Sequence, residues 1–229
     1  MDVWHTQDSM QHQWFIDQRE YERHQARRGR RHAYERIEPL RAALVVVDMI
    51  PFFVESNPYA RGIVPVIDSL ARTVRNTGGT VAWTVPGAPS PDDRAEFFGV
   101  EVAQVYAASG GSGPITERLW PELDPDAGDL FVEKTAPSAF FPDRCPLPTL
   151  LDERGVDTVL ITGTVANVCC ESSARDASTL GYRVVFVADG NAAARDADLN
   201  ATLHTIYRSF GDVRSASEVG DLLTSTGSH

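Results

Sequence analysis

Three side chains that could do chemistry together each follow an apolar run of the chain. Asp48 comes directly after residues 44–47, Lys134 follows 131–133, and Cys169 closes a turn that begins after 161–163. A thiol can attack a carbonyl carbon, a carboxylate can take the thiol proton and return it, and an ammonium can stabilise the charge that develops. Of the 21 basic residues only Lys134 is a lysine, and an ammonium is not interchangeable with a guanidinium at close quarters. This set of groups predicts acyl transfer.

Cys169 stands at the expected start of a helix, and its position suggests an activated thiol. A free cysteine is about 3% thiolate at pH 7, whereas a helix amino terminus and a nearby cation can lower its pKa to roughly 3.5 to 7.5. Backbone N–H groups of the preceding turn would face the same spot and could form an oxyanion hole. Each residue also has an ordinary alternative: a capping or paired aspartate, a surface lysine and a small core cysteine.

Apolar, β-branched runs alternate with helical patterns along the chain. Strands are predicted at residues 43–47, 80–85, 129–132, 158–162 and 183–188, with a sixth at 212–215, and helices at 63–77, 147–154, 167–180 and 196–210, each ended by glycine. This alternation predicts a three-layer α/β/α, doubly wound, mostly parallel six-stranded sheet of the Rossmann-like kind. Ligands bind beyond the carboxyl ends of such strands, where all three candidate groups fall.

The chain divides into a helical extension over residues 1–41 and one domain over residues 42–229. The extension carries eight arginines against seven acids, and residues 4–28 are expected to form an added helix that packs on this subunit or a neighbour. Residues 86–121, rich in proline and glycine, are expected to be irregular and are a candidate lid; a variable insertion is the alternative.

Composition narrows the classes of partner. The net charge of −11 opposes binding to nucleic acid or an anionic membrane. The arginine-rich extension is interpreted as a solvated helix, with a basic arm for nucleic acid or phosphate as the alternative. No apolar run approaches the roughly 18 residues of a membrane span, so a cytoplasmic protein is expected. Three cysteines do not make a disulfide framework.

Three ordered motifs resemble the isochorismatase-like cysteine hydrolases, a family that includes nicotinamidases and the N-carbamoylsarcosine and ureidoacrylate amidohydrolases. The resemblance covers about residues 42–215. The motifs are the apolar strand, Asp48 and Phe53; Lys134 with Ser-Ala-Phe at 138–140; and residues 162–177, whose Asn-Val-Cys-x-Glu-Ser segment is closest to the ureidoacrylate branch. The implied fold is the isochorismatase-like hydrolase fold.

The resemblance implies a role for each matching residue. Asp48, Lys134 and Cys169 would form the catalytic triad, with Cys169 the nucleophile and Asp48 the proton shuttle. The oxyanion hole would fall on the backbone N–H groups of Val165 and Cys169, with a cis peptide bond before Val165. The expected substrate contacts are Phe53, Trp83 and Phe140. Family members usually assemble as dimers or tetramers, so a homodimer or homotetramer is expected.

Departures from the family pattern bear on metal and substrate. The metal-binding members carry an Asp-x-His cluster after the second strand, where this chain has Trp-Thr-Val-Pro at 83–86, and all six histidines lie outside residues 33–203. A metal-independent enzyme without cofactor is therefore expected. Pro51 and Ala166 replace polar residues usual in the family, which alters the expected substrate contacts there.

The leading functional hypothesis is hydrolysis of a C–N bond in a small amide, lactam or N-carbamoyl or ureido compound through a Cys169 thioester. The alternative is an isochorismatase-type vinyl ether hydrolase, which uses the aspartate as an acid and needs no thiol. A third class, in which the adjacent Cys169 and Cys170 act as a redox sensor or metal site, is disfavoured because adjacent cysteines close only a strained ring.

Overall fold

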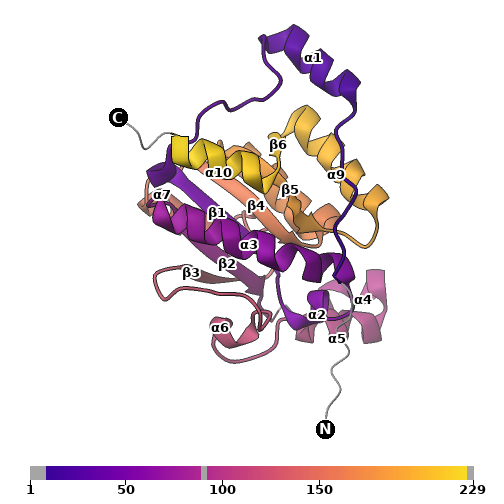
Figure 1. Ribbon diagram of the computed structural model, residues 1–229. Coiled ribbons are helices and arrows are strands. Elements are labelled where there is room, and N and C mark those ends of the chain that lie inside the picture. Colours follow the sequence, from indigo (N-terminus) through magenta and orange to yellow (C-terminus); the bar gives the residue numbers. More distant parts are fainter. Residues whose placement is uncertain (1–8, 89–91, 226–229) are drawn as a thin grey trace.

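The protein is built around a six-stranded parallel sheet (Figure 1). The structure, a computed structural model, describes residues 9–88 and 92–225. The strands are β1 (Ala42–Val47), β2 (Thr80–Pro86), β3 (Leu130–Lys134), β4 (Thr158–Thr164), β5 (Arg183–Ala192) and β6 (Asp212–Arg214). Their order is β3-β2-β1-β4-β5-β6, and every neighbouring pair is parallel. The predicted α/β/α class is confirmed, with an all-parallel sheet where a mostly parallel one was expected.

Helices cover both faces of this sheet. The helices α3 (Pro58–Asn76) and α10 (Ala216–Ser225) bury apolar residues against one face, in a cluster that includes Ile67 and Leu223. The helices α7 (Leu147–Glu153), α8 (Glu171–Thr179) and α9 (Asp196–Ser209) cover the other face, in a cluster that includes Leu151 and Leu203. Strands buried on both sides explain the continuous apolar runs of the sequence.

Several element boundaries differ from the sequence-based expectation. Helix α3 begins five residues early because the Asn57 side chain accepts hydrogen bonds from the N–H groups of Tyr59 and Ala60. Helix α8 begins at Glu171, after a π-helical turn over Ala166–Cys170. The segment 86–121 is not irregular throughout, since it contains α4 (Asp92–Phe98), α5 (Val100–Ala108) and α6 (Ile115–Arg118).

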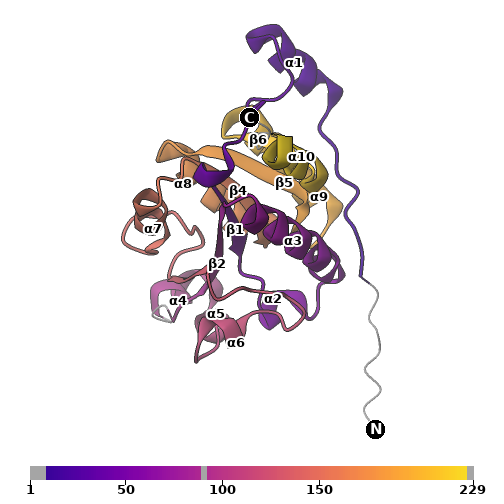
Figure 2. The same ribbon diagram turned by 60° about the vertical axis from the view of Figure 1, so that its left-hand side comes forward.

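The expected helix over residues 4–28 forms only in part. Residues 1–8 lie outside the described part of the chain, residues 9–17 are not helical, and α1 covers Gln18–Arg28 with Asp17 as its cap. Helix α1 packs on α9 of the same chain, where Tyr21 and His24 contact the ring of Tyr207 edge-on. In both views α1 lies at the opposite end of the molecule from α4 and α5 (Figures 1 and 2).

Within residues 9–88 and 92–225, no helix combines the length and the apolar character that crossing a membrane would require.

A short helix and a tight strand contact shape the carboxyl end of the sheet. The strand β1 leads into α2 (Pro51–Val54), and the last residue of β1, Val47, pairs with Gly163 of β4. Gly163 has φ of 116°, and a Cβ atom there would lie 2.1 Å from the carbonyl oxygen of Val47. Only glycine lets the two strands approach this closely.

We therefore expect Gly163→Ala to lose about 3 kcal/mol or more of unfolding free energy, because it combines a backbone clash with a strained φ. The control is Gly155→Ala, since Gly155 has φ of +67° but no atom within 4 Å of its added Cβ; it should lose only about 1 to 2 kcal/mol. Urea unfolding measures both. Equal losses would show that the β1–β4 approach tolerates a side chain.

Candidate active site

Asp48 is held by both strands that flank β1. Its N–H donates to the carbonyl oxygen of Thr84 on β2 at 2.9 Å, and its own carbonyl oxygen accepts a 2.7 Å hydrogen bond from the Thr164 hydroxyl on β4. Its φ of 51° lies in the left-handed region, which turns the chain out of the strand. The residue is fully buried, so its carboxylate sits in a site without solvent.

Lys134 reaches this carboxylate from the edge strand of the sheet. Although β2 separates β3 from β1, Nζ of Lys134 lies 2.7 Å from Oδ2 of Asp48. The ammonium also donates to the carbonyl oxygen of Ala136 at 3.2 Å. Lys134 is itself buried, so this is an ion pair inside the protein rather than on its surface.

Cys169 completes the group from the π-helical turn between β4 and α8. Its side chain, 9% exposed, lies close enough to the Asp48 carboxylate for that carboxylate to raise the pKa of the thiol, and the backbone N–H of Val165 faces its sulfur. The carbonyl oxygen of Cys169 accepts a 2.7 Å hydrogen bond from Ser173. The structure thus brings together the three groups named from the sequence, although the first and the last of them, Asp48 and Cys169, are more than a hundred residues apart in the chain.

The pKa of the Cys169 thiol is raised, whereas the sequence predicted that it would be lowered. Burial, helped by the neighbouring Asp48 anion, raises the pKa of Cys169 to about 12, against the opposing effect of Lys134. The helix-terminus argument is wrong here because the thiol is enclosed and beside a carboxylate. The resting sulfur is therefore protonated at neutral pH, and its proton lies beside a base.

The other two groups are poised for proton transfer. Burial raises the pKa of Asp48 above its ordinary value, although Lys134 opposes this, so the carboxylate can hold a proton. Burial alone would lower the pKa of Lys134, but Asp48 and Cys169 together raise it, so the amine remains an ammonium. The arrangement can pass a proton from sulfur to Asp48 while Lys134 keeps its positive charge.

The backbone around the sulfur agrees with what the resemblance implied. The peptide bond between Thr164 and Val165 is cis, as expected. This geometry accompanies the approach of the Val165 N–H to the Cys169 sulfur. Cys170 points instead into the core, fully buried with its sulfur 3.9 Å from the carbonyl oxygen of Thr162, which agrees with its interpretation as a packing residue.

Two of the three expected substrate contacts are fully buried. Trp83 is fully buried, and its indole N–H donates to Asp129 at 2.7 Å, at the far end of β3. Phe140 is also fully buried, with its ring 5.5 Å from that of Tyr182. Neither ring is exposed in this structure, so a substrate contact by either one stays a prediction. Phe53 is the one of the three that is only partly buried.

Two hydroxyl groups position the site in ways that the sequence did not predict. Thr164 fixes the backbone of Asp48, as described above. Ser173 accepts a hydrogen bond from the N–H of Ala139 at 3.0 Å while donating to Cys169, so it ties the loop after Lys134 to the turn that carries the thiol. Both lie within the motif at 162–177, but a motif does not reveal which partner a hydroxyl will bond.

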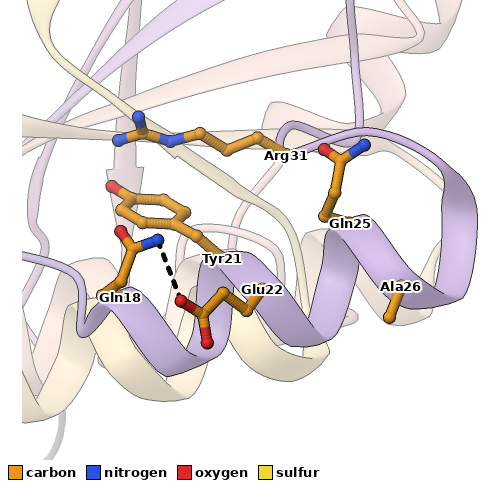
Figure 3. A pocket seen from close by; sticks show the side chains of 6 residues that line it. All are labelled: Gln18, Tyr21, Glu22, Gln25, Ala26 and Arg31. Carbon is orange, nitrogen blue, oxygen red and sulfur yellow. Dashed lines mark hydrogen bonds between the residues drawn. The ribbon is translucent and has the colours of Figure 1, made fainter.

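Two hollows of the surface lie away from the three catalytic candidates. One, of about 430 Å³, is formed by α1 and Arg31, whose guanidinium stacks 3.5 Å from the centre of the Tyr21 ring (Figure 3). Its lining is Gln18, Tyr21, Glu22, Gln25, Ala26 and Arg31. Another, of about 540 Å³, lies between α3 and α10. Neither includes any of the three catalytic candidates.

The described part of the chain holds no group of three or more histidine, cysteine, aspartate or glutamate side chains arranged to bind a metal ion. Its histidines contact other partners: His12 contacts Asp196, His24 contacts Tyr207, His32 contacts Asp212, and His204 contacts Glu20. Metal independence remains a prediction.

Comparison with known proteins places these residues in a family context. The isochorismatase domain family matches residues 42–218. A cysteine hydrolase from Pseudomonas syringae pv. phaseolicola 1448A superposes with a TM-score of 0.74 at 30% identity, over 85% of this chain and 97% of that one. An N-carbamoylsarcosine amidase from Thermoplasma acidophilum gives a TM-score of 0.64 at 29% identity, over 77% and 96%.

Among curated proteins, an isochorismatase of Bacillus subtilis (strain 168) is 33% identical over 162 residues. This match covers 66% of this chain and 48% of the relative, so the chain spans about half the length of that protein.

A substitution at Asp48 tests whether its charge raises the pKa of the Cys169 thiol. Replacing Asp48 with asparagine removes a negative charge beside the sulfur and leaves Lys134, so the pKa of Cys169 should fall. Asparagine also tolerates the left-handed backbone at this position. Thiolate absorbance in the ultraviolet, followed against pH, measures the change, with Cys169→Ser proteins to subtract the other cysteines. A pKa that stays near 12 would contradict the assigned contact.

Proposed function

The chain belongs to the isochorismatase family of hydrolases, and on that premise we propose that it cleaves the C–N bond of a small amide, lactam or N-carbamoyl compound through a thioester on Cys169. The observation that carries this proposal is the Cys169 thiol beside a buried carboxylate that is itself paired with Lys134. A nucleophile beside its base, with the base oriented by a third group, is the arrangement that covalent catalysis requires.

The reaction proceeds in two halves. As the sulfur attacks the carbonyl carbon, its proton passes to Asp48, and the carbonyl oxygen takes up negative charge facing the N–H groups of Val165 and Cys169. The C–N bond then breaks, and Asp48 returns the proton to the leaving nitrogen. In the second half Asp48 takes a proton from water as the oxygen attacks the thioester. The C–S bond then breaks, Asp48 returns the proton to the sulfur, and the acid leaves.

Each side chain has a distinct task in this scheme. Because the raised pKa keeps the thiol protonated at neutral pH, thiolate forms only as the carbon–sulfur bond forms, which couples proton transfer to attack. Lys134 stays charged throughout and limits the cost of a buried carboxylate. The likeness to a cysteine hydrolase and to an N-carbamoylsarcosine amidase supports a C–N substrate.

A second candidate function is the vinyl ether cleavage of an isochorismatase. The likeness to the Bacillus subtilis isochorismatase favours it, as does a buried Asp48 able to hold a proton. Such a reaction would make no use of the thiol, whereas in this structure the thiol lies beside the carboxylate and its pKa responds to that charge. The C–N hydrolase is therefore the better supported of the two.

Replacing the nucleophile tests the proposal. Cys169→Ala should lower kcat for amide hydrolysis by at least about a thousandfold, and brief mixing of the wild type with substrate should give a covalent adduct visible by protein mass spectrometry. Ammonia release measures turnover. Cys170→Ala, which removes the neighbouring buried sulfur, is the matched control and should keep both activity and adduct.

The same variant separates the two functions. Isochorismate cleavage that survives in Cys169→Ala, together with no adduct on any amide in the wild type, would replace the thioester proposal by the vinyl ether one.

A further inference from the structure

The pairing between β4 and β5 is broken just before the catalytic turn. The two strands lie side by side (Figure 1) and pair in order up to Ile161 and Phe186. Pairing resumes at Gly163 and Asn191, so β4 has one residue within the break and β5 has four. These four residues of β5, 187–190, are called the excursion. A buried break of this kind leaves backbone carbonyl oxygens that need a donor from elsewhere.

The side chain of Asn191 supplies donors at this break. Its amide nitrogen donates to the carbonyl oxygen of Ile161 at 2.8 Å and to that of Val187 at 2.7 Å. Ile161 is the last β4 residue before the break, and Val187 is the first residue of the excursion. Because both neighbours are acceptors, the nitrogen and not the oxygen of the amide must face them. The two hydrogen bonds therefore join the strands where their backbones do not.

Asn191 makes these bonds in a place that is unfavourable for a polar side chain. It is fully buried, and among the described residues its Oδ1 atom has no hydrogen-bond partner. An unpaired buried acceptor is unfavourable, and an apolar side chain would avoid it. The position thus keeps an amide for its two N–H groups rather than for its packing.

The residues that pair beyond the break hold the backbone of the reaction centre. Pairing resumes with Gly163 opposite Asn191, and Thr164 follows. The Thr164 hydroxyl binds the carbonyl oxygen of Asp48, and the next N–H, that of Val165, faces the catalytic sulfur. Since Asn191 spans the break immediately before these residues, its two bonds determine where the second stretch of pairing begins.

The excursion itself is packed closely on both sides. A Cβ atom added at Gly190 would lie 3.0 Å from the Thr162 side chain and 3.1 Å from that of Val187. Asp189 accepts a 2.7 Å hydrogen bond from the N–H of Ala216, at the start of α10. The excursion is therefore confined between β4 and α10, and the pairing beyond it cannot shift without disturbing these contacts.

We propose that Asn191 is a positioning residue of the reaction centre, whose two hydrogen bonds across the break aim the Val165 N–H at the Cys169 sulfur. For catalysis this inference rests on the proposed thioester chemistry, in which the same N–H faces the negative charge that develops on the substrate. A displaced donor stabilises that charge less, so the rate of the chemical step is affected rather than substrate affinity. The effect on the thiol can be measured without turnover.

Asn191→Leu tests this role, because leucine has nearly the shape of asparagine and has no N–H to donate. It also removes the unpartnered oxygen. We expect kcat for ammonia release to fall about ten- to hundredfold and KM to stay within about twofold. The substrate is whichever of acetamide, benzamide and N-carbamoylglycine the wild type hydrolyses fastest. An unchanged kcat would show that the side chain only fills space, and would overturn the proposal.

The matched control is Asn200→Leu on α9. The amide nitrogen of Asn200 also donates to two carbonyl oxygens, those of Gln13 and Asp196, both at 2.9 Å. These partners lie in the amino-terminal segment and on α9 rather than on β4 or β5. Asn200→Leu should lower the thermal unfolding temperature and keep the wild-type kcat. Equal falls in kcat for the two variants would assign the loss to general destabilisation and overturn the proposal.

Alkylation of Cys169 by iodoacetamide at pH 8 measures the effect without turnover. Peptide mass spectrometry with fragmentation separates Cys169 from Cys170. The Val165 N–H lowers the pKa of the Cys169 thiol, so Asn191→Leu should react about fivefold more slowly than the wild type, the factor that one typical hydrogen bond supplies. Asn200→Leu should react at the wild-type rate. An unchanged or faster reaction of Asn191→Leu would contradict the assigned role.

A second variant covers a failure of Asn191→Leu to fold. Burial raises the pKa of a carboxyl group, so Asn191→Asp should be protonated near neutral pH and keep one of the two hydrogen bonds. Its alkylation should be about two- to threefold slower than that of the wild type, and an equal rate would overturn the proposal. If neither variant folds while Asn200→Leu does, the bonds support the whole domain rather than the site, which also overturns it.

Failure of the proposed function looks different. A wild type that releases no ammonia from any amide, but in which alkylation of Cys169 is slowed by Asn191→Leu and not by Asn200→Leu, would retain the positioning role and remove the thioester chemistry.

Discussion

The contact between Asp48 and Lys134, 2.7 Å apart and out of reach of solvent, is the interaction on which the candidate site depends. Burying two charges is unfavourable by several kcal/mol for each ion, and removing one partner from such a pair typically costs about 3 to 5 kcal/mol. Burying this pair therefore lowers the stability of the fold unless the two charged groups are held close together. In return it places a carboxylate, with its pKa raised by burial, directly against the Cys169 thiol.

The sheet supplies the geometry that this pair needs. Parallel strands bring their carboxyl ends to one edge, so that residues from β1, β3 and β4 meet although they are distant in sequence. The close approach at Gly163 and the hydroxyl of Thr164 then fix the backbone on either side of Asp48. Precision at the site comes from backbone contacts between neighbouring strands, which cannot relax independently.

The two additions to this core lie at opposite ends of the molecule. The amino-terminal segment and α1 pack on α3 and α9, with His12 stacked on Tyr59 and α1 set against Tyr207. The segment with α4 and α5 stands at the reaction end and is braced by Arg118.

The sequence by itself determined the strands, the layer architecture and the identity of the three reactive groups, because continuous apolar runs, glycine stops and polar residues at strand ends are local signals. Tertiary structure alone decided the rest. The Trp83 ring became fully buried, helices formed within 86–121, and enclosure beside Asp48 raised the pKa of Cys169 where a helix terminus predicted the opposite. Burial and the distance between charges depend on residues far away in the chain, and no local pattern encodes them.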